Sequence, residues 1–398
     1  MKISRVSILV LLLFFNCSSD IDVPTVEMPP LTDVLTFEVS FGDEKTIDKD
    51  EFLLAKPRSM DVNIKGDIYV FDEWKFKIFD NKGRPKKIFG GYGQGTQEFS
   101  KIVEHIEISP EGFLTVLERG YYNLFSPDNS FIEKKNMAFD ETLIQIKNEY
   151  NVVFDRRCQI SALNEQEFII QASTVSMMNF QKLEKEKDFD YLFYVNSGNI
   201  KILAKYDIVN TVITIEGGGG SFTSQDRDIG RLVYSLLPDK RVAYSNSAID
   251  IDIKNNEGVL TLYTVDLGGL EKREIYYKYT PQKIPQSIID RFESRGKNHD
   301  KRVANMLREH MYLPPFNRLI TDGKYIILGI LIREEDGGVK DGEICVILDS
   351  ENGKTLQKAI FPSMSGIFNN GYYYNLKVSA DEFPVIEKYK IDPAVYGK

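Results

Sequence analysis

Units of several short β-rich runs recur along this chain, most of them about 40 to 60 residues after the preceding unit, and this repetition limits the fold more than any other feature. Each run holds alternating or apolar Val, Ile, Phe and Tyr and ends at Gly, Asn, Asp or Pro, which is typical of strands. Six such units are found, over residues 67–89, 113–134, 167–206, 241–267, 324–361 and 371–391. One four-stranded sheet cannot bury both of its faces alone, so units of this kind stack. The sequence therefore predicts an all-β fold, a six-bladed β-propeller.

Three breaks between these runs need a backbone conformation that most residues avoid. Gly83 in "DNKGR", Gly112 in "SPEGF" and Asn129 in "SPDNS" each lie between two strand-like runs. Gly and Asn tolerate a positive φ, which tight hairpin turns require. We therefore expect a hairpin at each of the three positions.

The segment 285–311 has helical rather than strand periodicity. Gly296 separates two sets of apolar residues whose spacing is close to 3.6. These are Ile288, Ile289 and Phe292, and then Val303, Met306 and Leu307. We predict a short helical insertion that covers a rim or the side of the ring. A small helical element that binds a partner is the alternative.

The N-terminal residues predict export and a lipid anchor. "MKISR" supplies two positive charges, and the apolar run "VSILVLLLFF" is too short to span a bilayer as a mature helix. The run leads into Cys17, and a cysteine in this place resembles the lipobox of bacterial lipoproteins, whose thiol is acylated. We expect a lipoprotein signal peptide over 1–17, a tether over 18–30 and the propeller over 31–398. An ordinary signal peptide with a coincidental cysteine is the alternative.

The glycine-rich stretch "FGGYGQGTQEF", residues 89–99, is predicted to connect two blades. It does not fit a P-loop, because Thr96 stands where the phosphate-binding lysine is needed, and it does not fit the G-x-G-x-x-G pattern of dinucleotide sites. A sharp turn would let Phe89 and Phe99 pack into neighbouring blades. We expect Gly93 and Gly95 to have positive φ or to lie too close to neighbouring backbone for a Cβ.

The same stretch resembles a connection found in six-bladed β-propeller lipoproteins with NHL-like repeats. The family pattern G-x-x-G-Q-G-P-G-E-F is matched by Gly90, Gly93, Gln94, Gly95, Glu98 and Phe99, whereas Thr96 and Gln97 replace Pro-Gly. Two further similar segments are "YLPPFNRLITDGKYIIL", residues 312–328, and the terminal "FPVIEKYKI". The resemblance implies an envelope-anchored propeller in a group whose members mostly have no assigned reaction.

No motif in the chain predicts a catalytic, cofactor or metal site. The G-x-S-x-G elbow and the C-x-x-C spacing are absent, and His299 and His310 do not form an H-E-x-x-H pair. Cys158 and Cys345 are either disulfide-bonded or two buried free thiols. His105 is interpreted as a satisfied core or rim histidine. The acidic residues Asp80, Asp128, Asp349 and Glu351 are interpreted as ordinary positions in turns.

The strongest polar cluster in the sequence is "DRRCQ", in which Arg156 and Arg157 enter a strand beside apolar residues. The two arginines would bind an anionic sugar or carboxylate in the channel, or else pair with acids at a blade edge. The net charge of −9 argues against a nucleic-acid partner.

The function predicted from the fold is a binding or scaffolding module of the bacterial cell envelope, held in the periplasmic leaflet or at the cell surface by its lipid anchor. Its partners would be the membrane and a glycan or envelope protein. A hydrolase or lyase that acts on a sugar or lactone in the propeller channel is the alternative.

The two ends of the chain are expected to close the ring. Residues 33–41 alternate as a half-buried strand does, and residues 384–391 form the last strand. A ring has no free sheet edge only if its terminal segments join. We therefore expect the first strand to lie in the same blade as the last ones.

Overall fold

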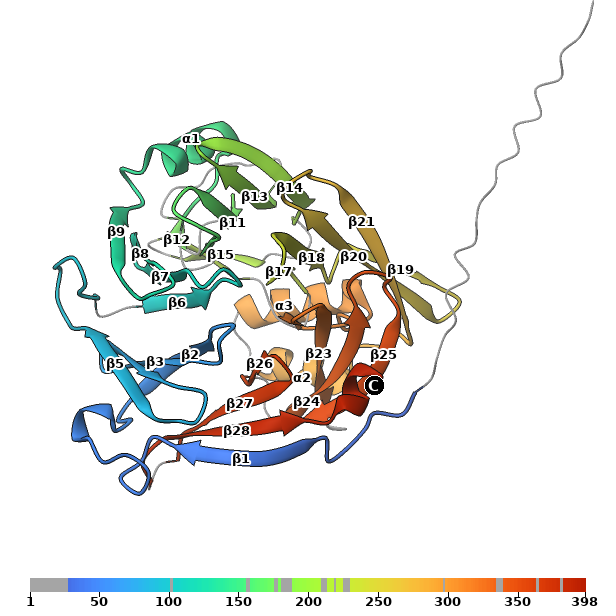
Figure 1. The fold of residues 1–398 in the computed structure, drawn as a ribbon. Helices are drawn as coiled ribbons and strands as arrows, with labels where there is room; N and C mark the ends of the chain where they lie inside the picture. Colours follow the sequence, from blue (N-terminus) through green and yellow to red (C-terminus); the bar gives the residue numbers. More distant parts are fainter. Residues whose placement is uncertain are drawn as a thin grey trace, which may run out of the picture.

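A computed structural model describes residues 28–100, 103–154, 158–174, 178–179, 188–208, 213–217, 220–224, 230–295, 298–333, 339–362, 365–379 and 382–398. Within these residues six antiparallel sheets stand around a central axis as the blades of a propeller (Figure 1), so the predicted fold class is confirmed. All six sequence units fall within the six blades, one in each.

The first three blades each have four strands, which follow one another from the axis outward. Blade 1 is β2 (Pro57–Val62), β3 (Ile68–Asp72), β4 (Lys75–Phe79) and β5 (Pro85–Gly90). Blade 2 is β6 (Val103–Ile108), β7 (Leu114–Glu118), β8 (Tyr121–Phe125) and β9 (Phe131–Asn136). Blade 3 is β10 (Gln159–Ala162), β11 (Glu167–Ser173), β13 (Phe189–Asn196) and β14 (Asn199–Asp207).

The other three blades follow the same plan with two variations. Blade 4 is β17 (Leu232–Leu237), β18 (Arg241–Asn246), β20 (Glu257–Asp266) and β21 (Lys272–Tyr279), and β19 (Ile251–Lys254) adds a fifth strand beside β20. Blade 5 is β22 (Arg318–Asp322), β23 (Tyr325–Arg333), β24 (Val339–Asp349) and β25 (Thr355–Phe361). Blade 6 is β26 (Ile367–Asn369), β27 (Tyr372–Lys377), β28 (Val385–Ile391) and β1 (Leu35–Phe41). A small separate sheet is formed by β12 (Met178–Asn179), β15 (Ile213–Gly217) and β16 (Gly220–Ser224).

The first strand closes the ring as predicted. β1 pairs with β28 in antiparallel register, so that residues from the two ends of the chain share blade 6. The chain also touches blade 5 just before β1, because Leu31 N donates to Lys358 O at 2.8 Å and Leu31 O accepts from Ile360 N at 2.9 Å. The regular alternation predicted for β1 is wrong in one place. The pairing register with β28 shifts after Phe37. The Phe37 side chain is 55% exposed, and its aromatic ring packs against that of Tyr389.

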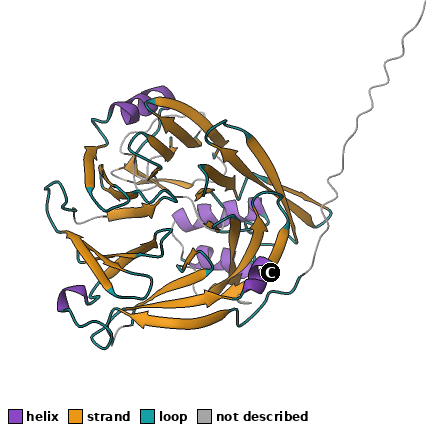
Figure 2. Ribbon diagram, in the orientation of Figure 1, coloured by secondary structure: helices purple, strands orange, loops and turns teal. Residues whose placement is uncertain are grey.

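The helical insertion is confirmed and a third helix was not predicted (Figure 2). α2 (Gln286–Ser294) and α3 (Asn298–His310) pack on one another around a small core of their own. α1 (Glu141–Tyr150) begins where the Asp140 side chain accepts from Leu143 N at 2.9 Å. Two short 3-10 helices, Asp50–Phe52 and Pro393–Tyr396, complete the elements of the described residues. Asp140 was the available signal for α1, since Asp is a preferred helix N-cap.

Each hydrophobic core of the ring lies between two neighbouring blades. The core between blades 1 and 2 contains both ends of the glycine-rich stretch: Phe89 and Phe99 each contact Phe125 of blade 2, at ring centroid distances of 4.9 and 6.2 Å. This confirms that the stretch connects blades. The strands of one blade therefore bury their apolar faces against the next blade, as large aromatic and β-branched side chains do between sheets.

The glycine-rich stretch differs from its prediction in which glycine is constrained. The positive φ, of 90°, is at Gly90, where an added Cβ would lie 2.4 Å from the Phe99 ring. Neither Gly93 nor Gly95 has a positive φ, and their added Cβ atoms would meet only the flexible Glu98 side chain. The expectation is thus wrong for φ at both positions, and the close approach there is to a side chain that can move aside.

The three predicted hairpin turns are confirmed. Gly83, Gly112 and Asn129 have φ of 77°, 92° and 66°, respectively.

Of the two alternatives for the cysteines, a disulfide or two free thiols, the structure shows the second. Cys158 and Cys345 are both buried free thiols.

Candidate functional site

The central axis of the ring holds a cavity of about 370 Å³. It is lined by the innermost strand of every blade: β2, β6, β10, β17, β22 and β26. A volume of this size lies within the range that small-molecule sites occupy, and the axis of the ring is the place where side chains from all blades converge. This cavity, which we call the channel site, is the candidate functional site.

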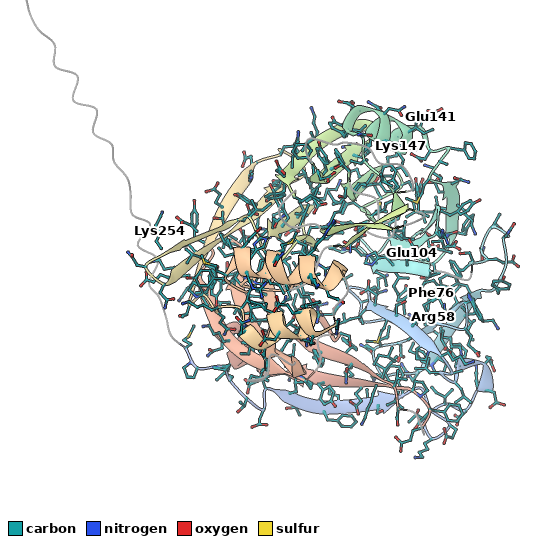
Figure 3. All side chains as sticks on the ribbon, turned by 180° about the vertical axis from the view of Figure 1, so that it is seen from behind. Arg58, Phe76, Glu104, Glu141, Lys147 and Lys254 are labelled. Atoms are coloured by element: carbon teal, nitrogen blue, oxygen red, sulfur yellow. The ribbon has the colours of Figure 1, made fainter. Side chains whose placement is uncertain are left out.

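The channel site opens toward the turns that follow the innermost strands. Ile64, Pro110, Pro238, Gly323 and Asn370 belong to these turns or border them, and all contribute to its wall. The opposite end of the ring receives the connections that lead into the innermost strands, and α2 and α3 belong to the connection that leads into β22. Figure 3, the view from behind Figure 1, shows these two helices lying across that end of the ring.

One wall of the channel site carries three ionisable side chains from blades 1 and 2. Asp61 projects from β2, and its two oxygens accept from Ile108 N at 2.6 Å and from Val62 N at 2.8 Å. His105 and Glu107 alternate on β6, and His105 Nε2 lies 3.4 Å from Glu107 Oε2. Because residues two apart in a strand face the same side, β6 presents both groups to the channel.

The surroundings shift the pKa values of two of these groups. Burial raises the pKa of Asp61 to about 7, although the amides of Ile108 and Val62 act in the opposite direction. Burial by itself would lower the pKa of His105, but the hydrogen bond and charge of Glu107, together with the charge of Asp61, raise it above its ordinary value. Both shifts favour the protonated forms.

A chain of hydrogen bonds continues from Glu107 into the next two blades. Ser161 Oγ on β10 donates to Glu107 Oε2 and also shares a hydrogen bond with the Tyr234 hydroxyl on β17. Ser161 is almost completely buried. Burial raises the pKa of the Tyr234 hydroxyl, and the Glu107 charge adds to the effect. The hydroxyl of Tyr234 therefore stays protonated and serves as a fixed polar group.

Across the channel, β22 of blade 5 contributes an arginine. Arg318 Nη1 lies 2.8 Å from Glu343 Oε1, whose side chain is 2% exposed, and Arg318 Nη2 donates to Gly366 O of blade 6. Burial raises the pKa of Glu343, and the Arg318 charge lowers it in part. The guanidinium is thus held in place by a buried carboxylate beneath it.

Side-chain hydrogen bonds join every pair of neighbouring blades around the channel. The six links are Asp61 to Ile108 N, Glu107 to Ser161, Ser161 to Tyr234, Ser235 to Thr321, Arg318 to Gly366 O and Asn369 to Val62 O. We call this set the channel belt. Each side chain of the channel belt thus has a hydrogen-bond partner in an adjacent blade, which fixes the positions of the site residues.

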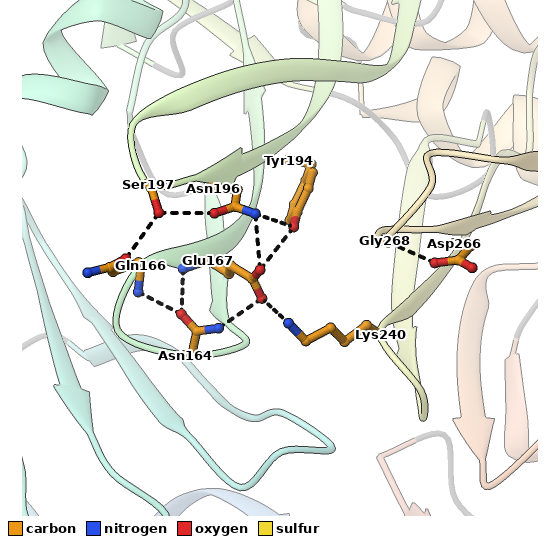
Figure 4. A network of polar contacts seen from close by, with 9 residues as sticks. All are labelled: Asn164, Gln166, Glu167, Tyr194, Asn196, Ser197, Lys240, Asp266 and Gly268. Atoms are coloured by element: carbon orange, nitrogen blue, oxygen red, sulfur yellow. Dashed lines mark hydrogen bonds and ion pairs between the residues drawn. The ribbon is translucent and has the colours of Figure 1, made fainter.

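A second polar network lies between blades 3 and 4 at the end of the ring where the cavity opens (Figure 4). Glu167 accepts from Lys240 Nζ at 2.7 Å and from Asn164 Nδ2 at 2.8 Å, and it also contacts Tyr194 and Asn196. The carboxylate is fully engaged by its neighbours. This network fixes the turns of the two blades and does not line the channel site.

The structure tests the predicted site residues only in part. Cys17, Arg156 and Arg157 lie outside the described residues. His105 lies in the channel wall and is half-buried, and Glu107 is its partner, as expected of a satisfied histidine. Asp80 accepts from Lys82 N at 2.9 Å and Asp349 from Glu351 N at 2.9 Å, as residues of turns do.

Sequence reasoning missed Asp61, Glu107 and Arg318. Each of the three lies in an ordinary β-rich run. The sequence feature that could have identified them is a charged residue on the strand that becomes the innermost one of its blade. A charge at such a position faces the axis rather than the surface.

In the described part of the chain, no group of three or more His, Cys, Asp or Glu is placed to hold a metal ion. None of the described helices has the length and apolar character needed to cross a membrane.

Comparison with known proteins adds no assignment. No family model matches this chain, and no curated protein matches it. Solved structures similar to it include an exported protein of Bacteroides fragilis, at 9% identity and a TM-score of 0.31, over 79% of this chain and 95% of that one. The extracellular domain of a one-component system of B. thetaiotaomicron is 10% identical with a TM-score of 0.31, over 84% and 40% of the two chains. A gluconolactonase of Xanthomonas campestris is 8% identical with a TM-score of 0.37, over 85% and 86%. Scores this low carry no argument about function.

Proposed function

We propose that this protein is a binding module of the bacterial cell envelope that takes a small polar ligand into the channel site. The observation that carries this proposal is a cavity of about 370 Å³ to which all six blades contribute and whose wall combines ionisable groups with apolar side chains. Sites for small molecules are concave and largely preformed, and a few fixed polar groups set their specificity. The channel belt provides such groups.

The anchored location rests on the sequence. The export segment ends at Cys17 in a pattern similar to a lipobox, and the chain resembles propeller lipoproteins with NHL-like repeats at residues 90–99, 312–328 and 383–391. A lipid-anchored propeller of this kind would present its ligand site in the periplasm or at the cell surface. A glycan fragment or an envelope-protein segment is the class of ligand that such a location supplies.

Thermal-shift and calorimetric titrations of the acylated protein in detergent test the proposal. The probes are hexoses, hexosamines, hexuronic acids and aldonolactones. We expect at least one probe to raise the melting temperature, and Ile320→Trp, which fills the channel wall, to abolish that rise. Ile202→Trp is the matched control, because Ile202 is 43% exposed on the outer strand of blade 3. A ligand that binds both variants equally well would place the site elsewhere.

A second candidate function is hydrolysis or elimination on a sugar or lactone in the same cavity. One observation favours it: Asp61, whose pKa burial raises to about 7, and His105 share one wall of the channel. A carboxylic acid that is still protonated near neutral pH is suited to act as a general acid. Turnover of an aldonolactone, lost in Asp61→Asn and retained in the exposed variant Asp252→Asn, would support the enzyme. Binding without turnover would support the module.

A further inference from the structure

We infer that the channel site selects ligands that carry a primary ammonium group. This inference rests on the proposed function, since it names the class of ligand for the same cavity. It follows from how the charges of the wall are paired. Arg318 already has a buried partner, whereas Asp61 and Glu107 have no lysine or arginine partner in the described part of the chain.

Arg318 is poorly placed to bind an anion. Its guanidinium lies 2.8 Å from the buried carboxylate of Glu343, and a second donor of the same group is used by Gly366 O. A carboxylate ligand would have to compete with Glu343 for the same fork of donors. The positive charge of this wall is therefore largely neutralised before any ligand arrives.

The carboxylates of the opposite wall are in a different state. Among the described residues no lysine or arginine forms an ion pair with Asp61 or Glu107. Within the described residues Asp61 is held by the two backbone amides of Val62 and Ile108, and Glu107 by Ser161 and His105. Backbone and hydroxyl donors orient a carboxylate without cancelling its charge. A ligand ammonium placed between the two would gain charge-assisted hydrogen bonds.

A third carboxylate independently points to an absent donor. Asp322 lies in the cavity wall at the end of β22 and is 3% exposed. Its Oδ2 accepts from Gly371 N at 3.0 Å and from the Tyr396 hydroxyl, and the Asn370 amide also acts on this carboxylate. Its Oδ1 nevertheless makes no hydrogen bond of ordinary geometry in the described part of the chain. Lys398 is close enough to act on Asp322 through its charge. A buried carboxylate oxygen without a donor is costly, and a ligand N–H group would remove that cost.

The state of His105 agrees with a site that attracts cations. Burial disfavours its charged form, yet Glu107 and Asp61 outweigh burial and raise its pKa. The two carboxylates thus already stabilise one positive charge, that of protonated His105. An ammonium group delivered by a ligand would compete with that proton for the same two carboxylates.

The rest of the ligand is expected to be neutral and partly apolar. Ile64, which is 52% exposed, Pro110 and Pro238 border the mouth of the cavity, and Met60 and Ile320 lie in its wall. A body with apolar faces, such as a sugar ring or a short alkyl chain, would cover these groups. The ammonium group would then lie deeper, against Asp61 and Glu107.

Isothermal titration of the full mature protein with two matched probe sets tests this inference. The sets are glucosamine, glucose and glucuronic acid, and butylamine, butanol and butyrate. At pH 8 we expect each amine to bind at least tenfold more tightly than its neutral and anionic counterparts. Asp61→Asn and Glu107→Gln should each reduce amine affinity about tenfold, whereas Asp252→Asn, an exposed carboxylate on β19, should leave it unchanged. Between pH 8 and pH 5.5 the affinity for butylamine, which stays protonated over this range, should fall as Asp61 takes up a proton, and that for glucose should not.

The outcomes separate the two proposals. Tighter binding of the neutral or anionic member of both sets, lost in Ile320→Trp, would overturn the inference and leave the proposed function standing. Amine binding that Asp61→Asn and Glu107→Gln leave unchanged, in variants that retain the wild-type circular dichroism spectrum, would also overturn the inference. Failure of every probe, amine or otherwise, to bind would overturn both.

Discussion

Leu35 of β1 pairs with Ile391 of β28, so that the first and last strands of the chain lie side by side in blade 6. The pairing removes the free edge that an incomplete sixth blade would expose. It also makes the ring depend on both ends of the chain, because β28 is sandwiched between β1 and β27. Loss of either terminal strand would open the cores on both sides of blade 6.

Deletion of residues 384–398 should therefore abolish cooperative folding. The deletion removes β28, including Ile386 and Ile391, which belong to the cores shared with blade 1 and with blade 5. Urea unfolding followed by circular dichroism measures the effect, and removal of only Gly397 and Lys398, both exposed, is the control. A soluble truncation with a single sharp transition would show that the ring closes without β28.

Replacing Gly90 should destabilise the ring more than replacing its neighbour Gly91. At Gly90 the backbone has a φ of 90°, and an added Cβ would meet the buried Phe99 ring, whereas at Gly91 no atom lies within 4 Å of an added Cβ. We expect Gly90→Ala to cost about 1–3 kcal/mol in the free energy of unfolding. Gly91→Ala should cost about 0.5 kcal/mol or less. Equal losses in the two variants would show that the turn adjusts freely.

Removal of the Lys77 charge should leave a buried carboxylate without its cation. Lys77 Nζ lies 2.8 Å from Asp72 Oδ2, and both side chains are almost fully buried. We expect Lys77→Met to reduce the free energy of unfolding by about 3–5 kcal/mol. Arg84→Met breaks the exposed pair with Asp80 and should cost less than about 1 kcal/mol. A small loss in Lys77→Met would mean that Asp72 is satisfied by its backbone donors, Ala55 N and Lys56 N, alone.

The stability of the ring should fall as pH rises from about 4 to above 7. Burial raises the pKa of Asp61 from 3.8 to about 7, so folding favours its protonated form below that pH. His105 acts in the same direction, because its folded pKa is raised above 6.5 and its contribution is lost as pH rises through the folded value. Wherever the folded state binds more protons than the unfolded state, stability decreases with pH.

Urea midpoints measured at intervals between pH 4.5 and 8.5 test this dependence. The charged and titratable groups that share the cavity wall with the pair are Glu107, Tyr234, Arg318 and Asp322. Asp61→Asn should flatten the profile between pH 4.5 and 7, and His105→Gln should flatten the part above pH 6.5. An unchanged slope in Asp61→Asn would show that this carboxyl group is ionised in the folded protein throughout the range.

Replacement of Cys17 should release the protein from the membrane. A lipobox-like cysteine is acylated on its thiol, and Ser offers no thiol for that modification. One acyl chain holds a protein only weakly, so firm anchoring depends on the several chains that a bacterial lipoprotein carries. Cell fractionation measures the share of the Cys17→Ser protein that remains in the membrane fraction. The control is Cys158→Ser, at a buried position in the ring. Membrane association of Cys17→Ser equal to that of the unchanged chain would rule out the lipid anchor.

The sequence determined the local structure of this protein. Gly83, Gly112 and Asn129 have the positive φ that tight hairpin turns require, and their residue types predicted it. The spacing of Ile288, Ile289 and Phe292 likewise defines the buried face of α2. Such features depend on neighbouring residues, so they can be read from a short window. Repetition of the same local unit was enough to predict a ring of six blades.

The channel site was decided by the tertiary structure. Asp61, Glu107 and Arg318 lie on separate innermost strands, and each is unremarkable among the charged residues of its own run. Only closure of the ring brings them around one axis, where the channel belt and burial set their hydrogen bonds and raise the pKa of Asp61. The same holds for the bulge after Phe37 and for the partner of Arg318, since both depend on strands distant in sequence. Propensity and periodicity report only short-range interactions, whereas these features arise from long-range packing.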